Sequence, residues 1–157
     1  MGIALTLQEY LDDHHVPYDV MLHKRTNCAF DTARATHVPG ERLAKAVVLT
    51  REGGFVIAVV PATARVRLDV IERMLHCHVQ LANEDEISEL FPDCELGAVP
   101  PIPEAYAVDA FVDESFDKQP DVYLEGGDHR SLVHVTAEAF RSIMRDVQRA
   151  HRRLELR

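Results

Sequence analysis

Apolar residues recur along this chain at two spacings, and each spacing predicts one kind of element. At the start, Thr6-x-x-Glu9 has the form of a helix capping box, and apolar residues follow at roughly helical intervals, at Leu5, Leu7, Tyr10, Leu11 and Val16. Residues 28–38 have the character of a second helix, which Pro39-Gly40 would end. The chain is therefore expected to open with a helix and to form another before residue 40.

Two runs of residues, 43–50 and 55–60, are apolar at nearly every position and are separated by the turn sequence REGG. Strands that are covered on both faces have this pattern, so the two runs predict a hairpin in the middle of a sheet. Shorter runs predict further strands at residues 16–22, 79–82, 107–113 and 121–135, the last folded back on itself at Gly126-Gly127.

Three more helices are predicted further along the chain. Asp69 can cap the segment VIERMLH, and Asn83-x-x-Glu86 opens a helix that Pro92 halts. A last helix is expected from Thr136, with one apolar stripe made of Phe140, Ile143, Met144, Val147 and Leu154. Because helices and strands do not strictly alternate, we predict a single α+β domain over residues 1–157, with a mixed, mostly antiparallel central sheet and flanking helices.

The composition limits the class of protein. The 157 residues include 26 Asp and Glu against 17 Lys and Arg, for a net charge of −9. This argues against a protein that grips DNA or RNA by bulk electrostatics, because such binding needs clustered cations, and any RNA would be held locally. No apolar segment is long enough to cross a membrane, the first residues lack a basic start, and three widely spaced cysteines suit a reducing cytoplasm as free, buried thiols.

Lys45 lies inside the first apolar run of the central hairpin. A lysine buried there must lose its charge or find an anionic partner, because an unpaired ammonium in low dielectric is costly. A lysine at the start of a strand can instead extend along the apolar surface to solvent. The residues alone leave both interpretations open.

Two glycine-containing segments are the other candidate sites. In GAVPP (residues 97–101), glycine permits close approach of a ligand to the backbone, and the prolines stiffen the loop so that its remaining amides and carbonyls form a fixed array. In GGDHR (residues 126–130), Asp128 and His129 can supply a hydrogen bond or a base near neutral pH. A rigid surface turn and a polar hairpin tip explain the same two segments structurally.

Other catalytic classes lack their signatures in this sequence. The pairs His14-His15 and His76/His78 do not have the spacing of a zinc site, and there is no GxSxG, GxGxxG or GxxxxGK[ST] motif. We therefore expect no metal, no cofactor and no covalent nucleophile.

The chain resembles the YbaK family in four segments taken in order, LHKRTNCAFDTARATHVPGERLAK, LAKAVVL, LFPDCELGAVPPIP and VYLEGGDHRSLVHV. Members of this family are single-domain aminoacyl-tRNA deacylases related to the editing domain of bacterial prolyl-tRNA synthetase, and the resemblance covers about residues 18–140. It implies a trans-editing hydrolase that cleaves the ester bond of mischarged aminoacyl-tRNA. Activity would depend on Lys45, and the pocket would be shaped by Gly97, Ala98 and Pro101, with Asp128 and His129 as further candidates.

The resemblance also implies a partner and a substrate class. The partner is the tRNA acceptor end, with an aminoacyl-tRNA synthetase as a further candidate, and alanine, serine and threonine precede cysteine as candidate amino acids. Many relatives carry glycine where this chain has Pro103, a difference that would act on the pocket rim. The basic residues near the lysine strand either line the pocket entrance or form a solvated face: Lys24, Arg25, Arg34, Arg65 and Arg67.

Two other functions suit the same fold. One is a binding module that captures a tRNA end or a small amino-acid-like ligand without hydrolysing it. The other is a hydrolase of small acyl esters unrelated to tRNA, which the acidic composition favours.

Overall fold

The apolar hairpin predicted for the middle of the sheet is the centre of the fold. In this computed structural model, which describes residues 2–150 and 155–156, β2 (Leu43–Arg51) and β3 (Gly54–Pro61) pair antiparallel. Lys45 lies opposite Val60 in this pair. Gly53 has a φ of +82°, which lets the chain reverse tightly between the two strands.

The other strands extend the sheet on both sides of this hairpin. Within the described residues the order is β1-β8-β7-β2-β3-β6-β9, and β5 also pairs with β2. Four of these pairs are antiparallel and three are parallel, which confirms the predicted mixed sheet. The bounds are β1 (Asp19–Leu22), β5 (Val79–Leu81), β6 (Asp109–Asp113), β7 (Asp121–Glu125), β8 (Ser131–Thr136) and β9 (Gln148–Ala150), with β4 (Arg65–Val66) and β10 (Glu155–Leu156) forming a separate pair.

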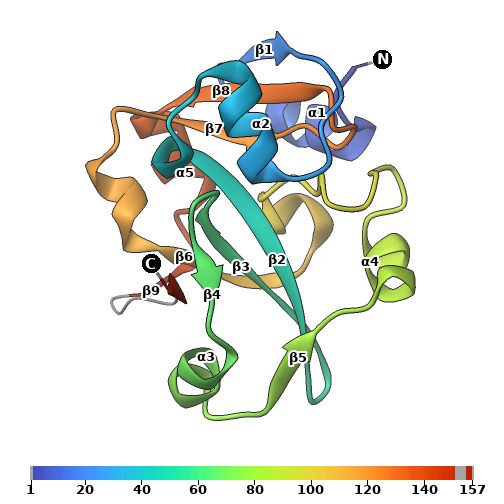
Figure 1. Ribbon diagram of the computed structural model, residues 1–157, viewed down its shortest axis with the longest axis vertical. Helices are drawn as coiled ribbons and strands as arrows, with labels where there is room; N and C mark the ends of the chain where they lie inside the picture. Colours follow the sequence, from blue (N-terminus) through green and yellow to red (C-terminus); the bar gives the residue numbers. More distant parts are fainter. Residues whose placement is uncertain (1, 151–154, 157) are drawn as a thin grey trace.

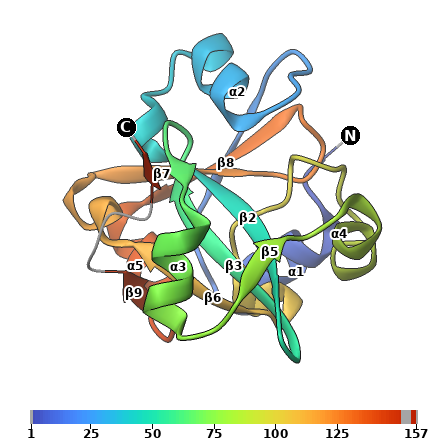
Figure 2. The ribbon, with the colours of Figure 1, turned by 60° about the horizontal axis from the view of Figure 1, so that its bottom comes forward.

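Helices cover both faces of the sheet. α2 and α3 lie on one face, and α1 and α5 lie on the other, while α4 stands at the side (Figure 1 and Figure 2). None of the helices in the described part of the chain is long and apolar enough to cross a membrane. The α-helices are α1 (Leu5–Asp13), α2 (Ala29–Thr36), α3 (Leu68–Leu75), α4 (Glu84–Leu90) and α5 (Ala137–Ile143), and short 3-10 helices span Gly40–Arg42, Pro103–Tyr106 and Glu114–Lys118.

The two faces of β2 contribute to different apolar groups. On one face, alternate residues of β2 pack against α1 and α5. On the opposite face, Leu43 packs beneath α2 and Leu49 packs beneath α3. Because side chains alternate along a strand, Lys45 shares the face of these two leucines and lies between the two apolar groups.

Of the predicted capping residues, Asn83 is confirmed and two others are wrong. The Asn83 side chain accepts a hydrogen bond from the amide of Glu86, and the Glu86 side chain accepts one from the amide of Asn83, so α4 begins with the predicted capping box. Thr6 and Asp69 instead lie inside α1 and α3, so neither residue caps its helix.

The last predicted helix is wrong beyond its second turn. α5 ends at Ile143, and the chain continues as β9, which pairs in parallel with β6. The edge of β6 offers backbone hydrogen bonds that helical periodicity cannot indicate. Met144 and Val147 still pack into the core, as their spacing suggests, and Leu154 lies outside the described residues.

The three cysteines are free thiols, but they are less buried than predicted. Cys28 is exposed, and Cys77 and Cys94 are half-buried. Cys28 is the N-cap residue of α2, and its side chain is one of the groups that act on Lys45.

Candidate active site

The ammonium group of Lys45 is held against the protein rather than extended into solvent. Its Nζ donates a hydrogen bond of 2.6 Å to the carbonyl oxygen of Ala64, in the turn between β3 and β4, and the side chain is half-buried. This partner is a carbonyl dipole and not a carboxylate, so the positive charge is oriented without being neutralised. Of the two interpretations of Lys45, the geometry agrees with a lysine held inside the protein and not with one that extends to solvent.

The surroundings of Lys45 act on its pKa in two directions. Burial lowers the pKa of the ammonium, because a charged group is less well solvated inside the protein. The nearby Cys28 side chain acts to raise this pKa, and the like charge of Arg65 acts to lower it further. The net effect is a lowered pKa, with Cys28 and Arg65 as the charged or ionisable neighbours that influence it.

The segment before α2 joins Lys45 to the GAVPP loop. Cys28, the neighbour of Lys45, is the N-cap residue of α2, and its side chain makes no capping hydrogen bond. The carbonyl oxygen of the preceding residue, Asn27, faces the loop, since a Cβ built on Gly97 would lie 3.4 Å from it. Lys45 and Gly97 therefore border the same two-residue segment from its two ends.

The GAVPP loop requires glycine at its first position. Gly97 has a φ of +82°, and a Cβ there would lie 3.1 Å from Cε1 of His129. Ala98 is fully buried, and its amide donates a hydrogen bond to the carbonyl of Glu95. Pro101 is also buried. The loop is thus tightly packed. The amide of Ala98 is already bonded to the carbonyl of Glu95 and is not a free donor for a ligand.

His129 fastens the tip of the β7-β8 hairpin to this loop. Its Nε2 donates to the carbonyl oxygen of Leu96, and the residue is only 5% exposed. The other ring nitrogen, Nδ1, is buried without a hydrogen-bond partner among the described residues. The amide of Glu95 also donates to the carbonyl of Gly127, at 2.7 Å. His129 therefore positions Gly97.

Asp128 stabilises its own turn. One carboxylate oxygen accepts a hydrogen bond of 2.9 Å from the amide of Arg130, and the other accepts one of 3.1 Å from the hydroxyl of Ser131. Both oxygens are thus engaged within the hairpin tip, as the structural explanation of this segment expects.

The basic residues flanking the lysine strand do not form one group. Arg25 pairs with Glu95 at 2.6 Å, at the start of the GAVPP segment, and Arg65 lies near Lys45. Arg67 pairs instead with Asp69 of α3. Arg34 lies over the Phe30 ring of α2 and Lys24 is exposed. Arg25 and Arg65 are therefore the two that border the candidate site.

A hollow of about 670 Å³ lies at the far end of β2 from Lys45. Arg51, Val56 and Pro103 are among the residues that line it, and none of the predicted site residues does. Pro103 begins the 3-10 helix Pro103–Tyr106, where its fixed φ suits the first turn. Pro103 therefore lines this second region, where none of the predicted site residues lies, and not the expected rim of their pocket.

A family model matches residues 23–143, described as the aminoacyl-tRNA editing domain. The matched range contains Lys45, the GAVPP loop and the hairpin tip. The chain belongs to the aminoacyl-tRNA editing domain family. This confirms the resemblance to the YbaK-type proteins, which the sequence indicated. In the described part of this editing domain, no group of three or more His, Cys, Asp or Glu side chains is arranged to hold a metal ion.

Solved structures share the fold of this editing domain. One, from work on computational grafting of epitopes onto scaffold proteins, is 23% identical with a TM-score of 0.81, covering 98% of this chain and 97% of that chain. Another is described as a candidate trans-editing enzyme for prolyl-tRNA synthetase, at 24% identity and a TM-score of 0.80, covering 97% and 96%. A third, described as a candidate signal transduction protein from Marinobacter aquaeolei, is 19% identical with a TM-score of 0.74, covering 93% of this chain but 30% of that one. No curated protein sequence matches at a significant level.

Glu125 is a polar residue of the editing domain that the sequence interpretation missed. It is the last residue of β7, is 2% exposed, and has both carboxyl oxygens buried without a hydrogen-bond partner among the described residues. Burial, and to a smaller extent the charge of Asp128, raises the pKa of Glu125 to about 7. Its place before Gly126-Gly127 is visible in the sequence, but the face on which it lies follows only from strand pairing.

Proposed function

We propose that this chain is a trans-editing deacylase that hydrolyses the ester bond of mischarged aminoacyl-tRNA without a metal or cofactor. One observation carries the proposal: the Lys45 ammonium is oriented by the Ala64 carbonyl at 2.6 Å but not neutralised, beside the segment that contacts Gly97. Membership of the editing-domain family supports the reaction class.

The role of Lys45 follows from where charge develops during the reaction. When water attacks the carbonyl carbon of the ester, the carbonyl oxygen becomes negative, and an ammonium group aimed at it lowers the barrier. The bond to the ribose oxygen then breaks, and that oxygen takes up the proton that the water loses. A neighbouring ribose hydroxyl can relay this proton, so the reaction needs no metal-bound water. Lys45 can equally hold the terminal phosphate of the tRNA.

The GAVPP loop supplies placement rather than charge. Gly97 is held by His129 on one side and by the Asn27 carbonyl on the other, so its backbone is fixed relative to the segment beside Lys45. Rigid placement of an ester against a catalytic group removes much of the entropic barrier to reaction. We assign Gly97, Ala98 and Pro101 to the wall of the aminoacyl pocket and Asp128 and His129 to its support.

The proposed substrate is a tRNA acceptor end that carries a small amino acid, with alanine, serine and threonine ahead of cysteine. Local contact through Arg25 and Arg65 suits a protein whose net charge is −9, since only the acceptor end needs to be held. A structure of the same fold is described as a candidate trans-editing enzyme for prolyl-tRNA synthetase, which supports an aminoacyl-tRNA synthetase as a partner. We place the protein in the cytoplasm, where tRNAs are charged.

A deacylation panel tests this proposal. The purified protein is incubated with tRNAs charged with alanine, serine, threonine or cysteine, and with free amino-acid esters, and the loss of each ester is followed over time. Hydrolysis of at least one charged tRNA, faster than that of the matching free ester, is the expected result. Tight binding of charged tRNA without turnover would favour a binding module, and preference for free esters would favour a small-ester hydrolase.

A further inference from the structure

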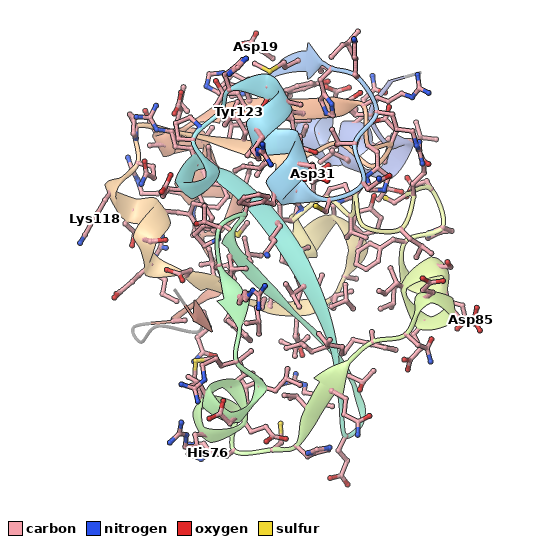
Figure 3. The ribbon with its side chains drawn as sticks, in the orientation of Figure 1. Asp19, Asp31, His76, Asp85, Lys118 and Tyr123 are labelled. Atoms are coloured by element: carbon pink, nitrogen blue, oxygen red, sulfur yellow. The ribbon has the colours of Figure 1, made fainter. Side chains whose placement is uncertain are left out.

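Lys45 and Glu125 directly follow the last paired residues of two neighbouring parallel strands. β2 and β7 run parallel with Ala44 opposite Leu124, so the next positions along are Lys45 and Glu125. Because alternate side chains of a strand share a face, both point to the face that α2 covers. Tyr123, labelled in Figure 3, precedes them on the same face of β7 and packs with the apolar group beneath α2.

The carboxyl group of Glu125 lacks the partner that a buried acid normally has. Its two oxygens are buried and accept no hydrogen bond from the described residues, while the Lys45 ammonium donates to Ala64 instead. Buried polar groups are almost always hydrogen-bonded, because leaving one unpaired is costly. The partner of Glu125 is therefore not among the described residues, and a ligand that carries a hydrogen-bond donor would supply one.

The charged groups near these two residues fall into two sets of opposite sign. Lys45 of β2 is influenced by the like charge of Arg65 in β4. Glu125, at the end of β7, is influenced by the like charge of Asp128 in the turn that follows. A ligand that fits both sets would carry a negative end and a positive end.

The charged end of aminoacyl-tRNA has this polarity, since its phosphate and its developing oxyanion are negative and its α-ammonium is positive. We propose that Glu125 binds the α-ammonium group of the aminoacyl ester while Lys45 faces the negative end. This inference rests on the proposed function and deepens it. It restricts the substrates to esters with a free α-amino group and excludes N-acylated and peptidyl-tRNA.

The test compares alanyl-, seryl- and threonyl-tRNA with their N-acetylated forms. Glu125→Gln keeps the shape of the side chain but removes its charge, and Glu138→Gln is the matched control, because Glu138 is exposed on α5 on the opposite face. The wild type is expected to hydrolyse the free-amine forms about tenfold faster or more. Glu125→Gln should lose about 10- to 100-fold on these forms only, the range for a hydrogen bond to a charged group. Equal losses on both forms, or no loss, would overturn the role of Glu125.

A ligand that resists hydrolysis separates this inference from the deacylase proposal. Binding of 3′-alanylamino-3′-deoxyadenosine, an amide, is measured against its N-acetyl form. A preference for the free amine of about tenfold or more, lost in Glu125→Gln, supports the inference about Glu125. This holds even if the protein hydrolyses no charged tRNA, because the absence of hydrolysis would overturn only the deacylase proposal. Equal binding of the two ligands would overturn the inference alone. Thermal unfolding checks each variant, and Glu125→Met, which suits an apolar layer, replaces a Gln variant that does not fold.

Discussion

Lys45 Nζ and the carbonyl oxygen of Ala64 lie 2.6 Å apart, so the turn that follows β3 holds the ammonium of β2 in place. The hairpin that carries the lysine thus also orients it, because β3 returns the chain beside Lys45 before the turn begins. A lysine side chain loses substantial rotamer freedom when it is fixed in this way. Because the hairpin already fixes the Lys45 amine in the free protein, substrate binding does not have to supply the free energy of ordering it.

Replacing Gly97 by alanine is expected to lower both stability and activity. The φ of +82° strains any residue with a side chain, and the added Cβ would lie 3.1 Å from His129. We expect a loss of about 1 to 3 kcal/mol in the free energy of unfolding and about a tenfold or greater loss in deacylation rate. Denaturant titration and rate measurements check these values.

Gly53→Ala is the control for this change. Gly53 has the same φ of +82°, but nothing lies within 4 Å of the added Cβ. It should therefore show the backbone strain without the clash and without a loss of activity. Equal losses of activity in the two variants would contradict the placement of the GAVPP loop at the site.

Glu125 is expected to make stability depend on pH between about 4.5 and 7. Burial raises its pKa from 4.5 to about 7, so the native state keeps a proton that the unfolded state releases in this window. The free energy of unfolding then falls as pH rises, by about 3 kcal/mol in total, and this contribution is constant above pH 7. Glu125→Gln removes the effect, so urea titrations should show a variant advantage that grows from pH 4.5 to 7. A constant difference would contradict a buried, unpaired carboxyl.

We expect activity to fall at alkaline pH when Lys45 loses its proton, and Arg65→Ala is expected to move this fall to higher pH. Burial is the main cause of the lowered pKa of Lys45, and the positive charge of Arg65 lowers it further, so removing Arg65 raises it. The ammonium then stays charged to a higher pH. Deacylation rates corrected for spontaneous hydrolysis give the pH profile. Arg67→Ala serves as the control, because Arg67 pairs with Asp69, and an identical shift in both variants would argue against a local effect.

Local sequence signals predicted the centre of this fold well. The hairpin of β2 and β3, the reversal at Gly126-Gly127 and the Asn83 capping box depend on short-range patterns, and all three are confirmed. The fate of the chain after Ile143 depends on a strand edge that lies far away in the sequence. The apolar spacing at Met144 and Val147 was therefore compatible with a longer helix, although the chain leaves the helix after Ile143 and continues into β9.

The candidate site was likewise predictable only where the signal lay within one short segment of the sequence. Lys45 and Gly97 stood out because each is unusual in its own segment, a lysine in an apolar strand and a glycine before two prolines. Glu125 did not, because a glutamate at the end of a strand is ordinary until its neighbour is known. Only the parallel pairing of β7 with β2, which ends at Ala44 opposite Leu124, places Glu125 at the next position on the covered face that Lys45 shares. Relationships between distant strands are what the sequence pattern left out.

The catalytic role of Lys45 is tested by single-turnover hydrolysis of alanyl-, seryl- and threonyl-tRNA by the wild type and by Lys45→Met. Methionine is close in length to lysine and suits a half-buried position, so the variant is expected to fold. Lys118→Met is the matched control, because Lys118 is exposed at the periphery, where Figure 3 labels it. We expect a loss of about 100-fold or more for Lys45→Met, the scale of removing an oxyanion-stabilising group, and no change for Lys118→Met. A folded Lys45→Met protein that kept the wild-type rate would contradict the catalytic role of Lys45.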